Sequence, residues 1–394
     1  MIYLKNIIKI IYNYWFILSF FIVLFYAFYG SIIDERLELN GVVQDIDKIE
    51  CTIDTVMEGE FQSYLNDIWD RGFPGKNFLI RVRNQLIYSV LRQSPNANYV
   101  MGKDAYLFEP SYINFELGLN TSISDEYCDE TIEKIVKLRR LLSENGKELY
   151  FFITPSKADF KKDKIPWYYN IMEIENNNSG RLTHQKHIDI YEKSGAKYFD
   201  AVNWIKENSK FHEAPVFYKS GIHWNNVWGE TAASELINYI SETSQYNLDV
   251  LSVKEKRIEE PIWPSTDLYS NMNLLLLPNE EWWNTEVEIV DKGKDNPNVF
   301  MRGGSFMGQS LSKMIRSGVF KKDVYLENYY YFTDKYTTQT LLTSYTSYDE
   351  MPLDTMLGET DIIIIEVNDT QVGSISFGFI DYLLEHGEYL DRKY

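Results

Sequence analysis

The segment Asn298–Ser305, which reads Asn-Val-Phe-Met-Arg-Gly-Gly-Ser, joins a short apolar strand to a glycine turn that ends on a serine. Met307 to Ser317 continues as a predicted helix, so the segment is a strand-turn-helix unit. In parallel sheets such units place their turns at the carboxyl ends of the strands, where active sites usually lie. The two glycines allow a tight turn and let a substrate approach the backbone closely. Ser305 is therefore the first candidate for a chemical role.

Strands and helices alternate along the rest of the chain. Glu148–Thr154 is almost entirely apolar, as is typical of a strand that is covered on both faces. The other predicted strands are Lys197–Asp200, Asp323–Leu326 and Asp361–Val367, and the predicted helices are Asp125–Asn145, Thr183–Ser194, Trp228–Ser241 and Phe377–Glu385. The alternation predicts an α/β fold, a three-layer α/β/α sandwich with a parallel central sheet. Lys254–Pro264 and Asn279–Pro297 are predicted to be surface excursions.

The N-terminus contains a long apolar run, Ile10 to Ile33, without a formal charge. About 20 such residues are enough to cross the hydrocarbon core of a membrane. Lys5 and Lys9 precede the run and acidic residues follow it, which predicts that the N-terminus lies in the cytoplasm and the remainder outside. We expect one N-terminal transmembrane helix, that is, a single-pass anchor in the cell membrane with an extracytoplasmic domain. The alternative is a cleaved signal peptide.

Three parts are expected along the chain: an anchor at 1–36, a membrane-proximal helical segment at 37–98, and the α/β domain at 99–394. Apolar residues recur at helical spacing between Glu60 and Arg92 and are interrupted at Gly72-Phe73-Pro74-Gly75. This pattern predicts two helices joined by a turn. Tyr99 to Leu107 is predicted to form a short hairpin.

The composition excludes some classes of function. A formal net charge of −19, with no basic stripe to offset it, argues against binding to nucleic acid. Five histidines and no Cys-x-x-Cys motif argue against a structural zinc site, so we expect no metal and no cofactor. His184 and His187, three residues apart on a predicted helix, are more simply surface histidines. Cys51 and Cys128 are equally compatible with a disulfide and with two free thiols.

A second candidate lies in Lys219-Ser220-Gly221-Ile222-His223-Trp224-Asn225, a loop before a predicted helix. Neutral imidazole is the usual base for a serine hydroxyl. Taken singly, Ser305 is more simply a helix cap and His223 a packed histidine beside a tryptophan. Both fall at predicted strand–helix junctions of one sheet, however. If they meet in space, they provide an activated hydroxyl for acyl transfer.

Several short segments, taken in order, resemble the AlgX/AlgJ-type alginate O-acetyltransferases and the related DHHW proteins. The matching segments are Gly102–Phe108, Pro155–Lys157, His223–Asn225, Asp267–Leu268, Gly304–Phe306 and Ile365–Asn368. These relatives are SGNH-hydrolase-like domains at the cell exterior. The resemblance implies an SGNH-hydrolase-like fold, Ser305 as nucleophile and His223 as its base. It also implies acetyl transfer to a polysaccharide, usually beside a membrane acyltransferase of the MBOAT type.

One departure from the family concerns the acid. Relatives commonly carry it two residues before the histidine, as Asp-x-His-Trp, and here that position is Gly221. Loss of the orienting acid from a working triad can cost roughly 10⁴ in rate. Asp267 or Glu366 could substitute, and we take Asp267 as the candidate. A Ser-His dyad oriented by a backbone carbonyl, or an inactive site retained for binding, are the other outcomes.

Four more residues are predicted to contact the oxyanion or the substrate: Gly304, Asn368, Lys157 and Trp224. Asn368 follows a strand and could donate to an oxyanion, or simply form a turn. Lys157 could contact an anionic sugar, although holding the strand end is the simpler role.

The sequence thus predicts a membrane-anchored O-acetyltransferase of the cell envelope that modifies a cell-surface or secreted polysaccharide through a Ser-His acyl-enzyme. The alternatives are a carbohydrate esterase that uses the same residues, and a non-catalytic glycan-binding scaffold in an export or acetylation complex. The expected partners are the polysaccharide, an MBOAT-type acyltransferase and the membrane, with no nucleic acid.

Overall fold

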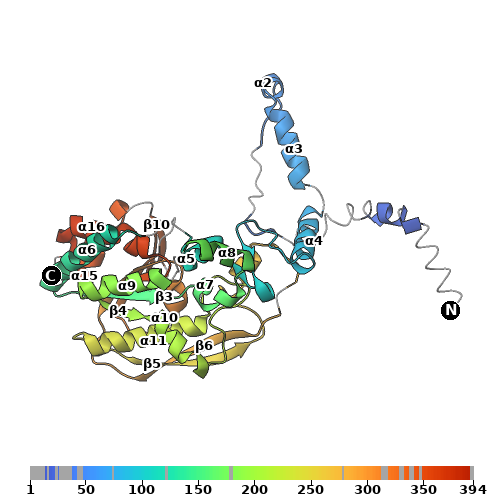
Figure 1. Cartoon of the computed structure of the whole chain (residues 1–394). Coiled ribbons are helices and arrows are strands. Elements are labelled where there is room, and N and C mark those ends of the chain that lie inside the picture. Colours follow the sequence, from blue (N-terminus) through green and yellow to red (C-terminus); the bar gives the residue numbers. More distant parts are fainter. Residues whose placement is uncertain are drawn as a thin grey trace. The chain divides into compact units, whose positions relative to one another are not determined.

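The computed structural model describes residues 14–15, 17–22, 25, 38–41, 48–72, 75–119, 123–176, 181–276, 279–311, 318–327, 332–336, 341–345 and 348–390. The chain divides into two compact units (Figure 1). One comprises residues 1–97 and 269–278, and the other residues 98–268 and 279–394. Most of the predicted anchor, Ile10 to Ile33, lies outside the described residues. In the described part of the chain, no helix has the length and apolar character that a membrane crossing needs.

The first unit is helical. Its helices are α2 (Ile53–Met57), α3 (Glu60–Gly72) and α4 (Lys76–Ser89). The last two are the helices predicted between Glu60 and Arg92. Gly75 begins α4 in the left-handed region, at φ 76°, which favours glycine. The distant segment 269–278 belongs to this unit because Asn84 Nδ2 donates to the carbonyl of Met272 at 2.7 Å.

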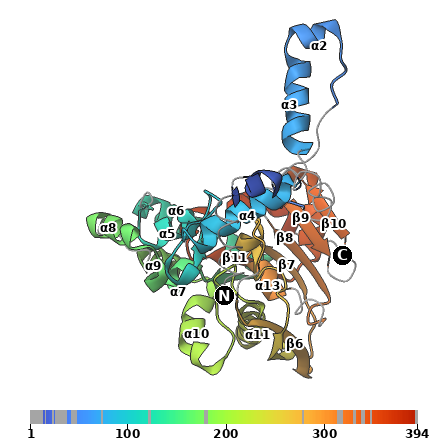
Figure 2. The same ribbon diagram turned by 90° about the vertical axis from the view of Figure 1, so that its right-hand side faces the viewer.

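The second unit is built on a seven-stranded sheet in the order β10-β9-β8-β7-β11-β3-β4. The strands are β3 (Glu148–Thr154), β4 (Lys197–Asp200), β7 (Asn298–Gly303), β8 (Lys322–Glu327), β9 (Phe332–Tyr336), β10 (Leu341–Tyr345) and β11 (Ile362–Asn368). The run from β8 to β4 is parallel, and β9 and β10 continue it antiparallel (Figure 2). The predicted parallel α/β fold is confirmed.

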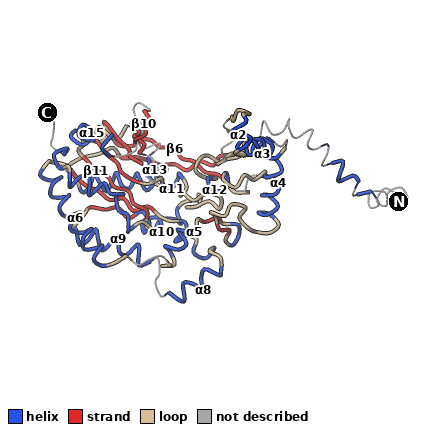
Figure 3. Tube along the Cα trace, turned by 90° about the horizontal axis from the view of Figure 1, so that it is seen from above, coloured by secondary structure: helices blue, strands red, loops and turns tan. Residues whose placement is uncertain are grey.

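Helices cover both faces of this sheet (Figures 1 and 3). On one face lie α6 (Asp125–Glu144), α9 (Arg181–Ser194), α15 (Leu353–Glu359) and α16 (Phe379–Glu385). Their apolar residues form one core with alternate residues of β3 and β11, such as Phe151 and Ile365. On the other face lie α10 (Ala201–Asn208), α11 (Asn226–Thr243) and α13 (Met307–Leu311). The predicted helix from Met307 to Ser317 is thus described as far as Leu311.

Two segments predicted as surface excursions form a paired ribbon instead. β5 (Val250–Ile258) and β6 (Trp282–Asp291) pair antiparallel over their whole length. Lys254 and Lys256 form ion pairs with Glu288 and Glu286 across the two strands. These charges face solvent and make the segments look like loops, but Trp282 and Trp283 are buried. The prediction failed because it read each segment alone, whereas pairing determines the ribbon.

Short elements complete the second unit. They are β1 (Val100–Met101), β2 (Leu107–Phe108), α5 (Pro110–Glu116), α7 (Lys157–Phe160), α8 (Trp167–Asn176) and the first two residues of α12 (Asp267–Ser270), with 3₁₀ helices at Lys103–Ala105, Lys162–Lys164, Ser209–Phe211, Tyr348–Glu350, Val372–Gly378 and Gly387–Leu390. β1 and β2 pair antiparallel, as the hairpin predicted at Tyr99–Leu107 requires. Cys51 and Cys128 are both free thiols.

Candidate active site

The serine turn lies at the carboxyl end of β7, the middle strand of the seven-stranded sheet. A side chain at Gly303 would place its Cβ 2.8 Å from Cβ and Oε2 of Glu366, so only glycine fits there. The Gly304 N–H donates to Glu366 Oε2 at 2.7 Å, and the hydroxyl of Thr154 donates to the other oxygen of Glu366. β11 therefore contributes a buried carboxyl that holds the turn on which Ser305 sits. Burial raises the pKa of Glu366 to about 7.

The histidine loop is held from two sides. Glu280 accepts hydrogen bonds from the Lys219 N–H and the Ser220 hydroxyl, each at 2.7 Å. Lys157 donates to the carbonyls of Lys219 at 2.9 Å and Gly221 at 2.7 Å. These bonds keep the loop, and the histidine it carries, in one position.

The serine and histidine turns are also joined to each other. The indole N–H of Trp224 donates to the carbonyl of Phe306 at 2.9 Å. Asn225 caps α11 through its side chain, which accepts from the N–H of Val227. His223 precedes Trp224, and Ser305 precedes Phe306. The bond between Trp224 and Phe306 therefore holds the histidine and the serine at a fixed distance from each other.

Three predicted residues meet in one hydrogen-bonded chain. His223 Nε2 lies 2.8 Å from Ser305 Oγ. His223 Nδ1 contacts Asp267 Oδ2, and the other oxygen of Asp267 accepts the N–H of Ile222 at 2.8 Å. A carboxylate can only accept, so it assigns the ring proton to Nδ1 and leaves the Nε2 lone pair facing the serine hydroxyl. This is the geometry of a serine nucleophile with a base and an orienting acid.

The acid reaches the histidine from a different segment than in the Asp-x-His-Trp pattern. A Cβ at Gly221 would lie 2.9 Å from the carbonyl oxygen of Ser265 and 3.0 Å from that of Pro264. The turn that carries Asp267 therefore occupies the space where a side chain at position 221 would begin. Glycine at 221 and aspartate at 267 belong together: the first makes room for the segment that delivers the second.

Aromatic rings border the histidine. The centroid of the Phe306 ring lies 4.8 Å from that of His223, and the centroid of Trp263 lies 5.9 Å from it. Trp263 is 66% exposed, which is unusual for so large an apolar side chain. An exposed indole beside the reacting groups offers a flat surface for a bound ring.

A pocket of about 530 Å³ opens onto the serine and the histidine. Its lining residues are Glu109, Ser111, Tyr112, Phe115, Ile222, His223, Ser305, Thr370 and Gln371. The volume lies within the range of small-molecule sites.

The remaining predicted site residues support the pocket without lining it. Lys157 is 2% exposed and Trp224 is fully buried. Asn368 donates to the carbonyl of Pro155 at 3.0 Å and accepts from the N–H and hydroxyl of Thr370. Gly304 uses its N–H on Glu366. Glu366 itself, the other candidate acid, contacts the serine turn and does not contact the histidine ring nitrogen that Asp267 occupies.

Sequence reasoning missed Glu109, Tyr112, Thr370 and Gln371. The sequence marks the chain position of Glu109 and of Thr370 and Gln371, although not their place in the pocket. Glu109 precedes Pro110, and proline is favoured in the first turn of a helix, so the Glu109-Pro110 pair marks the start of α5. Thr370 and Gln371 directly follow the last strand, at the edge where the other site residues lie.

Histidines outside the pocket have other environments. His184 Nε2 lies 3.1 Å from Asp200, and His187 is fully buried, which lowers its pKa to about 3. Among the described residues, no group of three or more histidine, cysteine, aspartate or glutamate side chains is arranged to hold a metal ion.

Comparison with known proteins gives one family. The family described as ALGX, SGNH hydrolase-like domain, acetyltransferase AlgX, matches residues 99–307, more than half of the chain. No curated protein matches the chain significantly.

Three solved structures are similar to this chain over most of its length. The O-acetyltransferase domain of Pseudomonas putida AlgJ is 14% identical, with a TM-score of 0.45, over 73% of this chain and 99% of that domain. Bacillus cereus PatB1, solved with a sulfonyl adduct, is 10% identical, with a TM-score of 0.45, over 70% of this chain and 94% of that one. Pseudomonas aeruginosa AlgX is 12% identical, with a TM-score of 0.44, over 76% of this chain and 70% of that one.

Proposed function

This chain belongs to the family of SGNH hydrolase-like AlgX acetyltransferase domains, and from that premise we propose that it transfers acetyl groups to hydroxyls of an extracytoplasmic polysaccharide through an acyl-enzyme on Ser305. The observation that carries the proposal is the contact of 2.8 Å between His223 Nε2 and Ser305 Oγ, with Asp267 on the other ring nitrogen. Family membership supports the reaction, and this contact supports its mechanism.

In the first half-reaction, His223 Nε2 takes the proton of Ser305 Oγ while the oxygen attacks the carbonyl carbon of the acetyl donor. Asp267 stabilises the imidazolium that forms. The tetrahedral intermediate then collapses, its bond to the leaving group breaks, and His223 returns the proton to that group. The product is an acetyl ester on Ser305.

The second half-reaction repeats these steps in reverse order. A sugar hydroxyl in the pocket gives its proton to His223 Nε2 and attacks the acetyl carbonyl. The bond to Ser305 Oγ breaks, and the serine recovers its proton from the imidazolium. Acetyl transfer to the sugar, rather than to water, requires that the sugar exclude water from the pocket.

The oxyanion of both intermediates needs a donor close to Ser305. Since the Gly304 N–H is bound to Glu366, we assign this role to the backbone N–H of Ser305 itself, which belongs to the same turn. Glu366 would then act on the oxyanion site indirectly, by fixing the turn.

Two observations support a glycan acceptor. The pocket combines aromatic residues, Tyr112 and Phe115, with the hydroxyl and amide side chains of Ser111, Thr370 and Gln371. The C–H faces of sugar rings pack on aromatic rings, and their hydroxyls bond to such polar groups. Trp263 extends this surface beside His223.

The alternative of a non-catalytic scaffold rested on the absence of an acid at position 221. Asp267 removes that support, because it makes the contact that the missing residue would make.

We also propose the setting. The uncharged run Ile10–Ile33 would anchor the chain in the cell membrane with the domain outside the cytoplasm. An MBOAT-type acyltransferase in the same membrane would supply acetyl groups across it.

The test uses the purified full-length chain, an activated acetyl ester and an oligosaccharide acceptor. Acetyl bound to the glycan is measured against free acetate. We expect acetylated glycan with the wild type and with Ser209→Ala, a matched control at an exposed serine, and none above background with Ser305→Ala. Transfer that survives Ser305→Ala would contradict the mechanism. Free acetate as the sole product would favour the esterase.

A further inference from the structure

The charges that line the pocket are unbalanced. Of its described lining residues, Glu109 is the one with a formal charge at neutral pH, and none is a lysine or an arginine. The neutral remainder consists of aromatic, aliphatic, hydroxyl and amide side chains beside His223. A ligand that enters this space therefore meets a carboxylate and no fixed cation.

The carboxylate of Glu109 is not used to cap its own helix. Glu109 is the residue before α5, and its carbonyl accepts the N–H of Tyr112 at 3.2 Å. Its side chain makes no capping hydrogen bond. It is half-buried in the pocket wall, where a ligand can reach it.

Among the described groups, the influences on the ionisation of Glu109 oppose one another. Burial raises the pKa of this carboxyl, the negative charge of Asp267 raises it further, and His223 lowers it. Lys157, the buried lysine that holds the histidine loop, is used elsewhere, because its ammonium group donates to the carbonyls of Lys219 and Gly221. Among the described residues, the mouth of the site thus carries one carboxylate and no lysine or arginine.

This arrangement discriminates between acceptors. A sugar with a carboxylate next to the reacting hydroxyl would place its negative charge beside that of Glu109 in a partly desolvated space. Repulsion between the two charges would weaken binding of such a sugar. A hydroxyl or an ammonium group would instead donate a charge-assisted hydrogen bond to Glu109.

We propose that Glu109 is a specificity residue that selects uncharged or amino sugars, and rejects uronates, as the acceptor of this site. The inference rests on the proposed function for the identity of the site as an acceptor pocket. It concerns charge selection alone and does not depend on the chemical step.

Binding tests it without catalysis. The full-length chain carrying Ser305→Ala is titrated by calorimetry with three trisaccharides of matched length: cellotriose (neutral), the β-1,4 trimer of glucosamine (cationic) and trigalacturonate (anionic). Low ionic strength and about pH 8 keep the carboxyl ionised and limit screening. We expect the neutral and cationic sugars to bind at least about tenfold more tightly than the uronate.

Changes in the charge of position 109 should move this ratio. Glu109→Gln should reduce the preference to within about threefold, and Glu109→Lys should reverse it in favour of the uronate. Glu259→Gln, which removes an exposed carboxylate elsewhere in the same unit, should leave the ratio unchanged. A variant that folds poorly would bind all three sugars more weakly, and the order of their affinities would not be reversed.

Equal affinities in the Ser305→Ala chain, a ratio that Glu109 variants do not change, or binding of none of the three sugars would each overturn the inference. The proposed function fails separately. If the chain shows charge-dependent binding but its Ser305 carries no acetyl group after reaction with a donor, the acetyltransferase proposal is wrong and the selectivity of Glu109 stands.

Discussion

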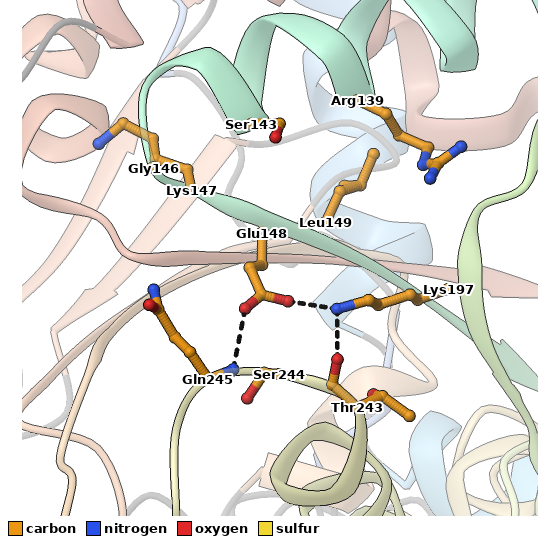
Figure 4. A pocket seen from close by; sticks show the side chains of 10 residues that line it. All are labelled: Arg139, Ser143, Gly146, Lys147, Glu148, Leu149, Lys197, Thr243, Ser244 and Gln245. Atoms are coloured by element: carbon orange, nitrogen blue, oxygen red, sulfur yellow. Dashed lines mark hydrogen bonds and ion pairs between the residues drawn. The ribbon is translucent and has the colours of Figure 1, made fainter.

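The sheet of the second unit carries a charged, hydrogen-bonded cluster at each end of its parallel strands. At the carboxyl ends are Ser305, His223 and Asp267. At the amino ends of β3 and β4, Glu148 accepts from Lys197 Nζ at 2.5 Å, and the same ammonium donates to the carbonyl of Thr243 at 2.6 Å (Figure 4). This second cluster borders a pocket of about 380 Å³. Each end thus combines a carboxylate, a nitrogen-containing side chain that contacts it, and a cavity.

The two clusters differ in what their protons can do. Burial lowers the pKa of Lys197, but its hydrogen bonds to Glu148 and Tyr150 raise it by more, so the ammonium group is charged at neutral pH and neutralises Glu148. The N–H of Gln245 also donates to this carboxylate. Asp267 is paired with an imidazole, whose other ring nitrogen faces a serine hydroxyl. Charge and a cavity are common to both clusters, whereas the cluster at the carboxyl ends also pairs an imidazole with a serine hydroxyl.

The largest effect is expected when the acid of the site, Asp267, is replaced. Asp267→Asn should lower the rate of acetyl transfer by about 10⁴, because an amide no longer stabilises the imidazolium or fixes the ring proton on Nδ1. Steady-state kinetics with an activated acetyl ester measure this change. Asp291→Asn, at an exposed aspartate, is the matched control. A loss below tenfold would show that the site works as a dyad.

The second effect concerns stability and pH. Glu366 accepts from a hydroxyl and an amide, not from an ammonium group as Glu148 does. Its pKa rises from 4.5 to about 7 on burial, so its contribution to the free energy of unfolding is present at low pH and is lost as pH rises through about 7. In the Glu366→Gln variant, the side chain at position 366 has no titratable group. The free energy of unfolding of the variant, relative to the wild type, should therefore rise by on the order of 3 kcal/mol between about pH 4 and pH 8.

Denaturant unfolding at a series of pH values measures this difference. Glu259→Gln, an exposed glutamate, should show no such trend. A difference between Glu366→Gln and the wild type that stays constant with pH would mean that this carboxyl has the same pKa in the folded and the unfolded chain.

The third effect tests the pairing of Gly221 with Asp267. Gly221→Ala would bring a methyl group to within about 3 Å of the carbonyls of Ser265 and Pro264, and the turn must then shift. A displacement of Asp267 by about 1 Å should cost about 10² in kcat, since catalysis depends on that alignment. Gly373→Ala, where the nearest atom is the flexible end of Ile123 at 3.7 Å, should leave kcat unchanged. Full activity in Gly221→Ala would show that the turn accommodates a methyl group at position 221 without displacing Asp267.

The smallest effect is expected at the opposite end of the sheet. Glu148→Gln breaks a partly buried ion pair and should reduce the free energy of unfolding by about 1 kcal/mol. The rate of acetyl transfer should change by less than about twofold, because no part of the cluster contacts the serine or the histidine. Thermal unfolding and kinetics on the same preparation give both numbers. A large loss of activity would remove the contrast between the two ends.

Much of the sheet was predictable, because buried parallel strands carry their own signal. The bounds predicted for Glu148–Thr154 and Lys197–Asp200 match β3 and β4. The β5–β6 ribbon was not predictable, because each strand is stabilised by its pairing with the other. Taken alone, each strand has the sequence of a polar loop.

The site was predictable in part, for a similar reason. Ser305 and His223 stand at strand–helix junctions, which the local pattern reveals. The side chains of Lys157, Trp224 and Asn368 are close by in the chain to such junctions, but pattern does not say which way they point. All three are directed into the structure, where they hold loops. Glu109 escaped notice because its place in the pocket depends on where a short helix packs.

The central claim is that His223 activates Ser305 as a nucleophile. It is tested most directly by trapping the acyl-enzyme: the full-length chain is mixed with an activated acetyl ester, quenched in acid, digested and analysed by mass spectrometry. We predict one acetyl group on the peptide that contains Ser305, located on that residue by fragmentation, and none on it in the Asp267→Asn chain at the same early time. An unmodified Ser305 in the wild type, or an acetyl group that appears on other residues instead, would contradict the account.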